Sequence, residues 1–481
     1  MIPIQMSQIA NKLNAQLIGD DCLIDKVYTD SRSAEQSGLF VALNGPLFDA
    51  HDFVSDAREK GADGFLLERK IALDKPQIVV KNTRLALAEL ARLNRQASDA
   101  EIVAITGSSG KTTVKEMVAS ILQQSSNILA TKGNLNNEIG APLTLLDIEE
   151  NTQFAVIELG ASQAGDIAFT ADITAPQVAL VNNIAAAHLA GFGSLQGVAK
   201  AKAEIYTSLT QQGVAIVNED CDYADYFKSN IDCQMIGYSI ESESDVYATE
   251  IKLTEAQSTH FNIQYQGKKQ AINLPLLGRH NVANAVAAAS CCLALDISLA
   301  QIAEGLSRIT AVDGRLLEYP LSHGRRLIDD SYNANLSSVM AAIDLLANYA
   351  NTTILVLGDL AELGDYGKSC HQKIGLYAAE KGIDKLYTYG DLTEFTQQAF
   401  RHSKGINNNN GLNQFHFSDQ QKLIQQLQKE ANAKQTILIK GSRSARMENI
   451  VHALREIDKN SSLEQASYSA ETSIASPRGD Y

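Results

Sequence analysis

The segment TGSSGKTT, residues 106–113, has residue types and spacing suited to binding the phosphate groups of a nucleotide. Glycines let backbone N–H groups turn toward phosphate oxygens, and the start of a following helix adds partial positive charge. Lys111 would reach the β- and γ-phosphates, and the hydroxyl of Thr112 would bind Mg²⁺. The full G-x-x-x-x-G-K-[ST] pattern requires glycine where this chain has Ile105, so a turn that caps an ordinary helix is the alternative. The residues predicted to contact the nucleotide are Gly107, Ser108, Ser109, Gly110, Lys111, Thr112 and Thr113.

Two further residues stand at or just beyond the ends of apolar runs that predict strands. Glu158 lies near the end of the run 153–159, and His188 follows the run 177–183. Ligands of open parallel sheets bind beyond the carboxyl ends of the strands, so both residues would lie near the phosphate loop. A carboxylate there would supply an oxygen ligand for phosphate-bound Mg²⁺. A lone histidine is more often structural, and the spacing leaves both roles open for His188.

Other polar positions are ambiguous from their spacing alone. Lys200 and Lys202 lie in a helical run and are most simply two solvated lysines. Residues 136–138 and 182–183 are polar clusters after apolar runs, where they could serve either a turn or a ligand.

The elements that must position these residues are strands alternating with helices. Short apolar runs rich in β-branched residues predict strands over 101–106, 153–159, 177–183 and 213–218, and again over 325–330, 352–359, 385–389 and 435–440. Such alternation predicts an α/β protein with a parallel sheet in each series. The expected organisation is a small N-terminal α/β domain over 1–98, a central nucleotide-binding domain over 99–313, a C-terminal α/β domain over 314–458 and a disordered tail over 459–481.

Length, charge and cysteine usage limit the class of protein. The 481 residues are enough for about three domains, and 41 Lys and Arg against 56 Asp and Glu argue against a general binder of nucleic acid or anionic membranes. The N-terminus lacks the pattern of a signal peptide, and no apolar stretch approaches the length of about eighteen residues that predicts a membrane span. Six cysteines without a C-x-x-C pair predict reduced thiols in a cytoplasmic protein. Nothing calls for an oligomer, and we expect a monomer.

Ten motifs occur in an order that resembles a single family. They are TGSSGKTT, NLNNEIGAPLTLL, ELGA, NNIAAAHL, KAKAEIY, GRHNVANA, the GR pair at 314–315, DDSYNAN, VLGDLAELG and KGSRSARME. Together they resemble the Mur ligases, the ATP-dependent amide ligases of peptidoglycan precursor synthesis, over roughly residues 25–455. The resemblance implies three domains: an N-terminal domain for the UDP-linked substrate, a central P-loop domain with a parallel sheet, and a Rossmann-like α/β domain that binds the incoming dipeptide.

The resemblance implies an amide ligase that works through an acyl phosphate. NNEIG, DDSYNAN and KGSRSARME are most similar to the family member that joins D-alanyl-D-alanine to UDP-N-acetylmuramoyl-tripeptide. ATP would phosphorylate the tripeptide carboxylate, and the dipeptide amine would then displace phosphate. The tripeptide carboxylate and the phosphates of ATP are both anions, so cationic side chains and Mg²⁺ would have to neutralise their charge. The family pattern implies two Mg²⁺ ions. The alternatives are a related ligase, such as the one adding the third amino acid or a folylpolyglutamate synthase, and a nucleotide-binding scaffold without ligase activity.

The resemblance also assigns roles to single positions. Lys202 matches a lysine that is carbamylated in the family and supports the metal site, where His188 would help bind the second Mg²⁺. Asn281 would contact the adenine region, Arg315 a phosphate and Asp330 the ribose of ATP. The residues matching substrate-binding positions are Ser31, Arg32, Asn136, Asn137, Glu138, Asn333 and Asn335.

Arg443, in KGSR, would face the incoming dipeptide or the peptide carboxylate, and the alternative is a helix-start arginine in a surface ion pair. The residues expected to act in catalysis are thus Lys111, Lys202, His188 and Arg443, and the expected metal ligands are Thr112, Glu158, His188 and Lys202. The chain departs from the usual family residues at Leu47, Ala50, Gln163 and Leu336. We expect the loss of the family's arginine in the stretch before HDF to affect contacts with the nucleotide sugar, and we expect catalysis to survive because the catalytic positions are intact.

Overall fold

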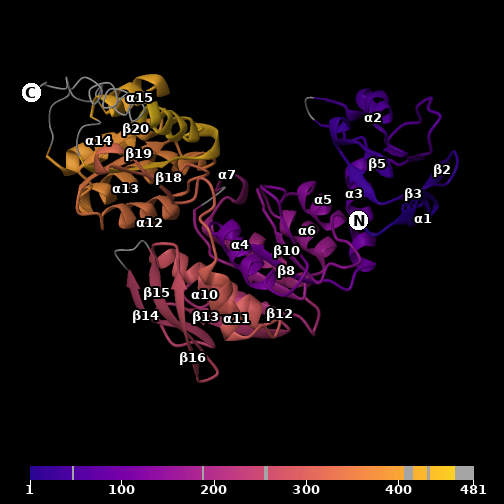
Figure 1. Ribbon diagram of the computed structural model, residues 1–481, viewed down its shortest axis with the longest axis horizontal. Coiled ribbons are helices and arrows are strands. Elements are labelled where there is room, and N and C mark those ends of the chain that lie inside the picture. The colour runs from indigo at the N-terminus through magenta and orange to yellow at the C-terminus, as the bar shows by residue number, and fades with distance from the viewer. Residues whose placement is uncertain (46–47, 187–188, 254–257, 406–414, 431–433, 461–481) are drawn as a thin grey trace, which may run out of the picture. The chain divides into compact units, whose positions relative to one another are not determined.

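The computed structural model of the chain describes residues 1–45, 48–186, 189–253, 258–405, 415–430 and 434–460. The described residues fall into two compact units. The first comprises residues 1–184, 196–275 and 279–309, and the second comprises residues 185–195, 276–278 and the described chain from residue 310 onward. In both units, helices cover the faces of β-sheets (Figure 1).

A nine-stranded sheet forms the centre of the first unit. Its order is β16-β15-β14-β13-β12-β11-β8-β10-β9, with parallel pairing from β9 through β14. The strands are β8 Glu101–Thr106, β9 Ile128–Ala130, β10 Phe154–Glu158, β11 Val178–Val181, β12 Val214–Asn218, β13 Gln234–Ser239, β14 Val246–Leu253, β15 Thr259–Tyr265 and β16 Lys268–Leu274. The four strands predicted in this region are confirmed. Because β8 lies between β10 and β11, the loop after β8 opens where the strand order reverses, which is where such sheets bind ligands.

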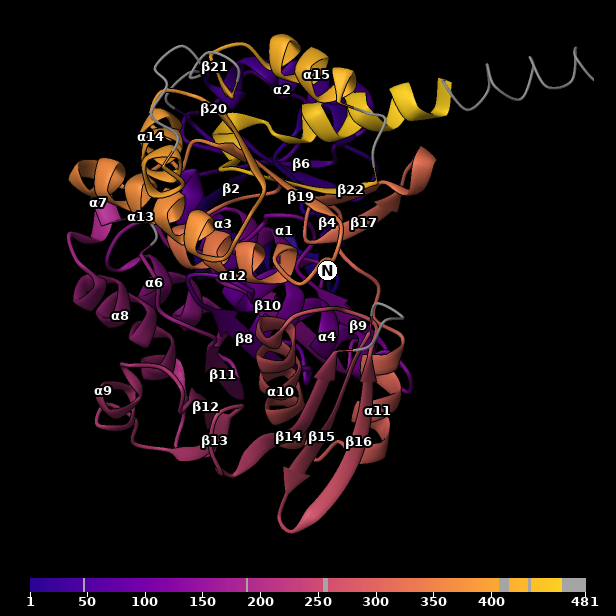
Figure 2. The same ribbon diagram turned by 90° about the vertical axis from the view of Figure 1, so that its left-hand side faces the viewer.

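Helices cover both faces of this sheet. On one face α4 (Lys111–Leu122) lies beside α10 (Arg279–Leu293), as Figures 1 and 2 show. On the other face, inward side chains such as Ala104, Ile157 and Val181 share a core with α3, α5 and α6. The other helices of the unit are α1 Met6–Lys12, α2 Val54–Lys60, α3 Thr83–Gln96, α5 Gly140–Leu146, α6 Asp166–Thr174, α8 Leu195–Ala203, α9 Ala224–Lys228 and α11 Leu299–Ser307.

The N-terminal part of the first unit has its own five-stranded sheet in the order β2-β7-β6-β5-β4. Its strands are β2 Gln16–Ile18, β4 Lys26–Tyr28, β5 Gly38–Val41, β6 Gly64–Leu67 and β7 Gln77–Val79, and a separate pair is formed by β1 Ile4–Gln5 and β3 Leu23–Ile24. Buried residues of this part, including Met6, Leu39 and Leu66, belong to the same core as α3 and the central strands. One hydrophobic core therefore extends from the N-terminal sheet through α3 into the nucleotide-type sheet.

The antiparallel strands β14–β16 extend the central sheet and were not predicted. The tight connection between β15 and β16 is made by Gln266 and Gly267, both with positive φ, +48° and +72°. Two consecutive residues with positive φ make a turn whose twist suits a β-hairpin, and Asn-Gly is its usual signature. Because glutamine replaces asparagine here, the signal is weak in the sequence.

A six-stranded sheet forms the second unit, in the order β17-β18-β22-β19-β20-β21. Its strands are β17 Leu317–Pro320, β18 Arg326–Asp330, β19 Thr352–Gly358, β20 Lys385–Tyr389, β21 His416–Phe417 and β22 Gln435–Lys440. All pairs are parallel except β17 with β18, which confirms the predicted α/β class. The helices that cover it include α12 Leu336–Leu346, α13 Gly367–Glu380, α14 Thr393–Ser403 and α15 Gln420–Lys429.

A final helix spans residues 448–460, so the first two residues of the tail predicted over 459–481 are helical. The rest of that segment lies outside the described residues. In the part of the chain that is described, none of the helices combines the length and apolarity needed to cross a membrane. All six cysteines are free thiols, as predicted, and Cys291 and Cys292 are fully buried in α10.

Candidate functional site

The loop between β8 and α4 is shaped by two glycines. A side chain at Gly107 would place its Cβ 3.0 Å from the Cβ of Asn182. Gly110, which precedes the first residue of α4, has φ +74°, and a Cβ there would lie 2.5 Å from Oδ1 of Asn284. Nζ of Lys111 donates to the carbonyl of Gly107 at 2.9 Å, so the lysine folds back over the loop. The loop thus places a cation and the start of a helix beside one another, as phosphate binding requires.

Two asparagines behind this loop hold its backbone, and two more extend the network. Oδ1 of Asn183 accepts from the N–H of Ser109 at 2.9 Å and from its hydroxyl at 3.2 Å, and Nδ2 of Asn183 donates to the Ser109 carbonyl at 3.0 Å. Nδ2 of Asn182 donates to the same carbonyl and to Oδ1 of Asn284, both at 3.0 Å. Asn284 in turn donates to Oδ1 of Asn281 at 3.3 Å. Asn281, expected near adenine, therefore belongs to a buried network that reaches the phosphate loop.

Glu158 lies beside the loop at the end of β10 and is buried. Its Oε2 accepts from the hydroxyl of Thr112 at 2.9 Å, and its Oε1 accepts from Nδ2 of Asn136 at 2.8 Å. Its main-chain N–H donates to the hydroxyl of Thr131 at 3.0 Å. The structure thus brings three of the predicted residues into direct contact.

The oxygens of Thr112 and Glu158 fit Mg²⁺ in chemistry. Among the described residues no group of three or more His, Cys, Asp or Glu side chains could hold a metal ion. Mg²⁺ is, however, usually held by one or two carboxylates together with substrate phosphates, and it keeps several waters. One hydroxyl and one carboxylate next to a phosphate loop match this pattern.

Lys202 in α8 is buried, whereas Lys200 is exposed. The expectation from spacing that both lysines are solvated is therefore wrong for Lys202. It makes no hydrogen bond or ion pair with any described residue, and burial, followed by the nearby charge of Lys111, lowers the pKa of its ammonium group well below the ordinary value. The surroundings thus favour the neutral amine.

Asn137 and Glu138, which follow Asn136 in the chain, make local contacts. Oδ1 of Asn137 accepts from the N–H of Gly140 at 2.9 Å, at the first residue of α5. Glu138 forms an ion pair with Arg84 at 3.6 Å. Asn137 therefore serves the helix start, which is the turn role left open for it, and the residue is exposed.

Ser31 and Arg32 lie in a short 3₁₀ turn after β4, Ser31–Ser33. The Arg32 side chain is 87% exposed, and its Nη2 lies 2.7 Å from Oδ2 of Asp30. This guanidinium, with the N–H of Arg32, lowers the pKa of Asp30 to about 2. Arg32 is thus an exposed cation on the N-terminal sheet, far along the chain from the phosphate loop.

In the second unit, Asp330 ends β18 and pairs with a residue that the sequence analysis missed. Nζ of Lys440, the last residue of β22, lies 2.6 Å from Oδ2 of Asp330 and donates to the carbonyl of Asn333 at 3.0 Å. Burial raises the pKa of the Asp330 carboxyl, and the cations of Lys440 and Arg315 oppose that rise. The motif KGSR begins with this lysine, but only the parallel pairing of β18 with β22 places it beside Asp330.

The two predicted arginines of the second unit, Arg315 and Arg443, both lie over the ring of Tyr332. The guanidinium carbon of Arg315 lies 4.5 Å from the centre of the Tyr332 ring, and that of Arg443 lies 5.7 Å from it. Nη1 of Arg443 also lies 3.1 Å from Oε1 of Glu448, and its side chain is 64% exposed. The structure therefore contains the surface ion pair considered for Arg443 and leaves its guanidinium open to solvent. Asn335 caps α12 by accepting from the N–H of Ser338 at 2.9 Å.

The loop after β19 is held by two residues that the sequence analysis did not select. The hydroxyl of Ser442 accepts from the N–H of Ala361 at 2.8 Å. His371, fully buried in α13, accepts from the N–H of Leu360 through Nε2 at 3.2 Å, and its Nδ1 lies 2.7 Å from the carbonyl of Gly367. Burial lowers the pKa of this imidazole, so the histidine is neutral and structural.

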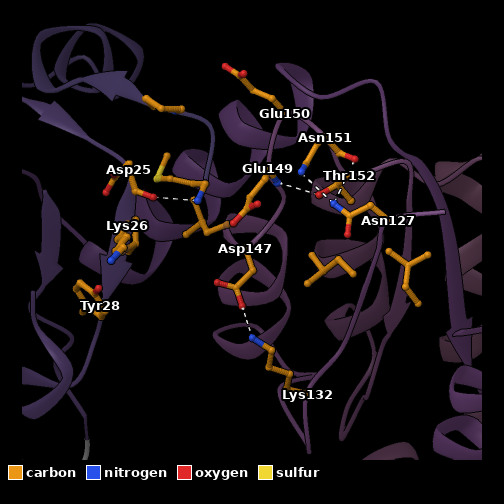
Figure 3. Close-up of a pocket in the computed structure, with 16 residues that line it drawn as sticks. Asp25, Lys26, Tyr28, Asn127, Lys132, Asp147, Glu149, Glu150, Asn151 and Thr152 are labelled. Atoms are coloured by element: carbon orange, nitrogen blue, oxygen red, sulfur yellow. Dashed lines mark hydrogen bonds and ion pairs between the residues drawn. The ribbon is translucent and has the colours of Figure 1, made fainter. Parts of the chain in front are cut away.

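A cavity of about 900 Å³ lies between the N-terminal sheet and the central sheet of the first unit. It is lined by Asp25, Lys26 and Tyr28 on one side and by Leu146, Asp147 and residues 149–152 on the other, with Lys132 paired to Asp147 at 3.2 Å (Figure 3). These linings adjoin the start of β9 and the segment entering β10. Glu158 stands at the opposite end of β10, so the cavity is separate from the phosphate loop.

The chain matches two family models, described as the Mur ligase middle domain over residues 105–292 and the Mur ligase glutamate ligase domain over residues 314–443. It is 45% identical to the UDP-N-acetylmuramoyl-tripeptide–D-alanyl-D-alanine ligase of Escherichia coli K12, covering 95% of this chain and 99% of that protein. The chain belongs to the Mur ligase family. The corresponding ligase of Bacillus subtilis is 34% identical to this Mur ligase over 95% of the chain and 99% of its own length. The structure of this chain is similar to that of MurF from Acinetobacter baumannii, with a TM-score of 0.87 and 35% sequence identity. The similarity covers 94% of this chain and 99% of the other.

Not every predicted position of this Mur ligase is described. His188 and Leu47 lie outside the described residues. Of the other departures from the family pattern, Ala50 is buried, Gln163 is exposed and Leu336 is the first residue of α12.

Proposed function

We propose that this Mur ligase joins D-alanyl-D-alanine to UDP-N-acetylmuramoyl-tripeptide, consuming ATP and releasing ADP and phosphate. The observation that carries the proposal is the 45% identity to the Escherichia coli enzyme of that name over almost its whole length. The phosphate loop, with Glu158 bonded to Thr112 beside it, supports nucleotide binding in the central sheet.

The first unit would hold the phosphates and the metal ions. The N–H groups at the start of α4 and the ammonium of Lys111 would bind the phosphates, and Thr112 and Glu158 would hold Mg²⁺. When bound, Mg²⁺ would neutralise the phosphate charge that otherwise repels an approaching carboxylate. His188 and Lys202 complete the proposed set of ligands for a second ion.

Lys202 would serve as a metal ligand only after carbamylation, which converts its neutral amine into a negatively charged carbamate. The neutral amine adds to carbon dioxide and loses a proton, so the low pKa that burial imposes favours the reaction. The resulting carbamate would be attracted to the nearby ammonium of Lys111. Incubation with ¹³C-labelled bicarbonate should give a carbamate NMR signal that is absent in Lys202→Met, and a signal of equal size in that variant would refute the assignment.

The reaction has two substitutions. A carboxylate oxygen of the tripeptide attacks the γ-phosphorus, the bond to the bridging oxygen breaks, and ADP leaves with an acyl phosphate formed. The dipeptide nitrogen then attacks the acyl carbon. The tetrahedral intermediate loses phosphate and the amine loses a proton, which leaves the amide. Lys111 would stabilise the charge of the transferred phosphate in the first step, and Arg443 would orient the dipeptide or the peptide carboxylate.

The remaining assignments complete the proposal. Ser31 and Arg32 would bind the UDP part, and residues 136–138 the sugar-peptide part. In the second unit Asp330 and Arg315 would bind the nucleotide, with Asn333 and Asn335 nearby. The proposed domains are 1–98, 99–313 and 314–458, in a cytoplasmic monomer.

Phosphate release from ATP tests the proposal, with Mg²⁺, UDP-linked tripeptide and D-alanyl-D-alanine each omitted in turn. Release should require all of them. Release with a single amino acid or glutamate in place of the dipeptide would point to a related ligase. ATP binding without turnover on any amine would point to a scaffold.

A further inference from the structure

Lys115 is a buried cation for which the proposed function gives no role. It lies in α4, one turn after Lys111, and only 2% of its surface is exposed. Its Nζ donates to the carbonyl of Thr131 at 2.6 Å and lies 2.7 Å from Oε1 of Glu116. Burying an ammonium group is costly unless it is paired and hydrogen-bonded. An apolar side chain would fill this place at lower cost, so the charge points to a specific task.

Thr131 connects that ammonium to the proposed metal site. It follows β9 and is 1% exposed. Its N–H donates to the carbonyl of Val156 at 3.0 Å, and its hydroxyl accepts from the N–H of Glu158 at 3.0 Å. Thr131 is therefore bound to β10 through two groups and to α4 through the third, its carbonyl.

Glu158 stands at the end of this chain of contacts. Its carboxylate accepts from Thr112 on the phosphate loop and from Asn136 on the segment after Thr131. We infer that Lys115 is a positioning residue, which fixes Thr131 between α4 and β10 and so holds the Glu158 carboxylate beside Thr112 for the nucleotide-bound metal ion. This inference rests on the proposed function, because it takes Glu158 as a ligand of that ion.

The direction of the effect separates positioning from simple electrostatics. A cation close to a metal site repels the metal ion, so removing the charge of Lys115 would by itself tighten metal binding. If Lys115 acts by holding Thr131 and Glu158 in place, its removal weakens metal binding instead. Residues that orient metal ligands typically change metal affinity by about 10-fold to 100-fold when replaced.

The test uses Mn²⁺ as a spectroscopic substitute for Mg²⁺. Mn²⁺ binding is titrated by electron paramagnetic resonance on the full chain with a non-hydrolysable ATP analogue, and binding of the analogue is also measured in EDTA. We expect Lys115→Met and Thr131→Val each to weaken Mn²⁺ binding by about 10-fold, with the double variant no weaker than the stronger single one. Analogue binding in EDTA should stay within about twofold of wild type. Lys132→Met is the matched control, since Lys132 is exposed and pairs with Asp147, and it should bind Mn²⁺ like wild type.

Each outcome has a defined meaning. Equal or tighter Mn²⁺ binding by Lys115→Met, with wild type binding normally, would overturn the positioning role. Failure of wild type to bind the analogue in a metal-dependent way would overturn the proposed function instead. If Lys115→Met does not fold by circular dichroism, Thr131→Val decides, because it removes one hydroxyl and leaves the shape unchanged. Wild-type Mn²⁺ affinity in that variant would likewise overturn the inference.

Discussion

The carboxylate of Glu158 carries the charge of the proposed metal site in the first unit. Glu158→Gln keeps the shape of the side chain and an oxygen that can accept from Thr112, but it removes the negative charge. We therefore expect phosphate release to fall by at least about 10-fold to 100-fold with little change in the melting temperature. Unchanged release at saturating Mg²⁺ would show that this carboxylate is not a metal ligand.

Lys202 makes stability depend on pH when it is not carbamylated. Burial and Lys111 lower its pKa in the folded state, so between that pKa and the ordinary lysine value the folded protein binds fewer protons than the unfolded chain. Stability due to this group therefore rises with pH across that window. In buffers free of carbon dioxide, Lys202→Met should melt above wild type near about pH 7, and the difference should shrink toward about pH 10. A difference that stays constant with pH in thermal melts would contradict the burial of an unmodified amine.

At the scale of elements, the junction of β8 and α4 depends on a backbone that only glycine adopts easily. Gly110→Ala would place a methyl group against Asn284 and Asn182 in addition to straining a left-handed residue. Gly133→Ala is the matched control, because Gly133 also has positive φ but a Cβ there would meet nothing within 4 Å. The control should cost about 1–2 kcal/mol in urea unfolding, and Gly110→Ala should cost about 1–3 kcal/mol more and weaken nucleotide binding. An equal loss of unfolding free energy in the two variants would mean that Asn182 and Asn284 can move away from the new methyl group at no cost in stability.

The segment that carries Lys202 is anchored to the sheet by a tyrosine. The hydroxyl of Tyr206 donates to the carbonyl of Ile216 on β12 at 2.8 Å and accepts from the N–H of Val181 on β11 at 3.2 Å. Tyr206→Phe would leave two buried backbone groups without this partner, at a cost of about 1–3 kcal/mol in urea unfolding. A cost below about 0.5 kcal/mol would indicate that the two strands satisfy these groups themselves.

The strands and the phosphate loop could be predicted because their signals are local. An apolar run followed by glycines, Lys111 and a helix is contained in one segment, and the structure reproduces it. The hairpin β14–β16 was missed because its turn uses Gln266-Gly267 in place of a familiar turn pair. Lys440 was missed because it meets Asp330 only through the pairing of strands 110 positions apart in the chain. The solvated role predicted for Lys202 was wrong because the side chain is buried. Its neighbours Ala201 and Ala203 are small, so the sequence gives no apolar pattern from which that burial could be predicted.

For the whole molecule, the proposed nucleotide contacts are divided between the two units, with Lys111 in the first and Asp330 in the second. In the proposed function both groups act on a single ATP molecule, so turnover would require the units to come together around it. Small-angle scattering should show a smaller radius of gyration when an ATP analogue and the UDP-linked tripeptide are added together. An unchanged radius at saturating concentrations of both would contradict this division of the site.

The contacts of Asn183 with Ser109 have a further consequence for the energetics of nucleotide binding. In the structure the N–H of Ser109 and the ammonium of Lys111 donate to oxygens of the protein itself. An incoming phosphate must therefore exchange with these acceptors, and the number of hydrogen bonds changes little. The favourable free energy then comes mainly from replacing neutral amide and carbonyl oxygens by charged ones. Affinity for ATP should accordingly depend strongly on the charge of the terminal phosphate and on ionic strength, and only weakly on how many contacts the loop makes.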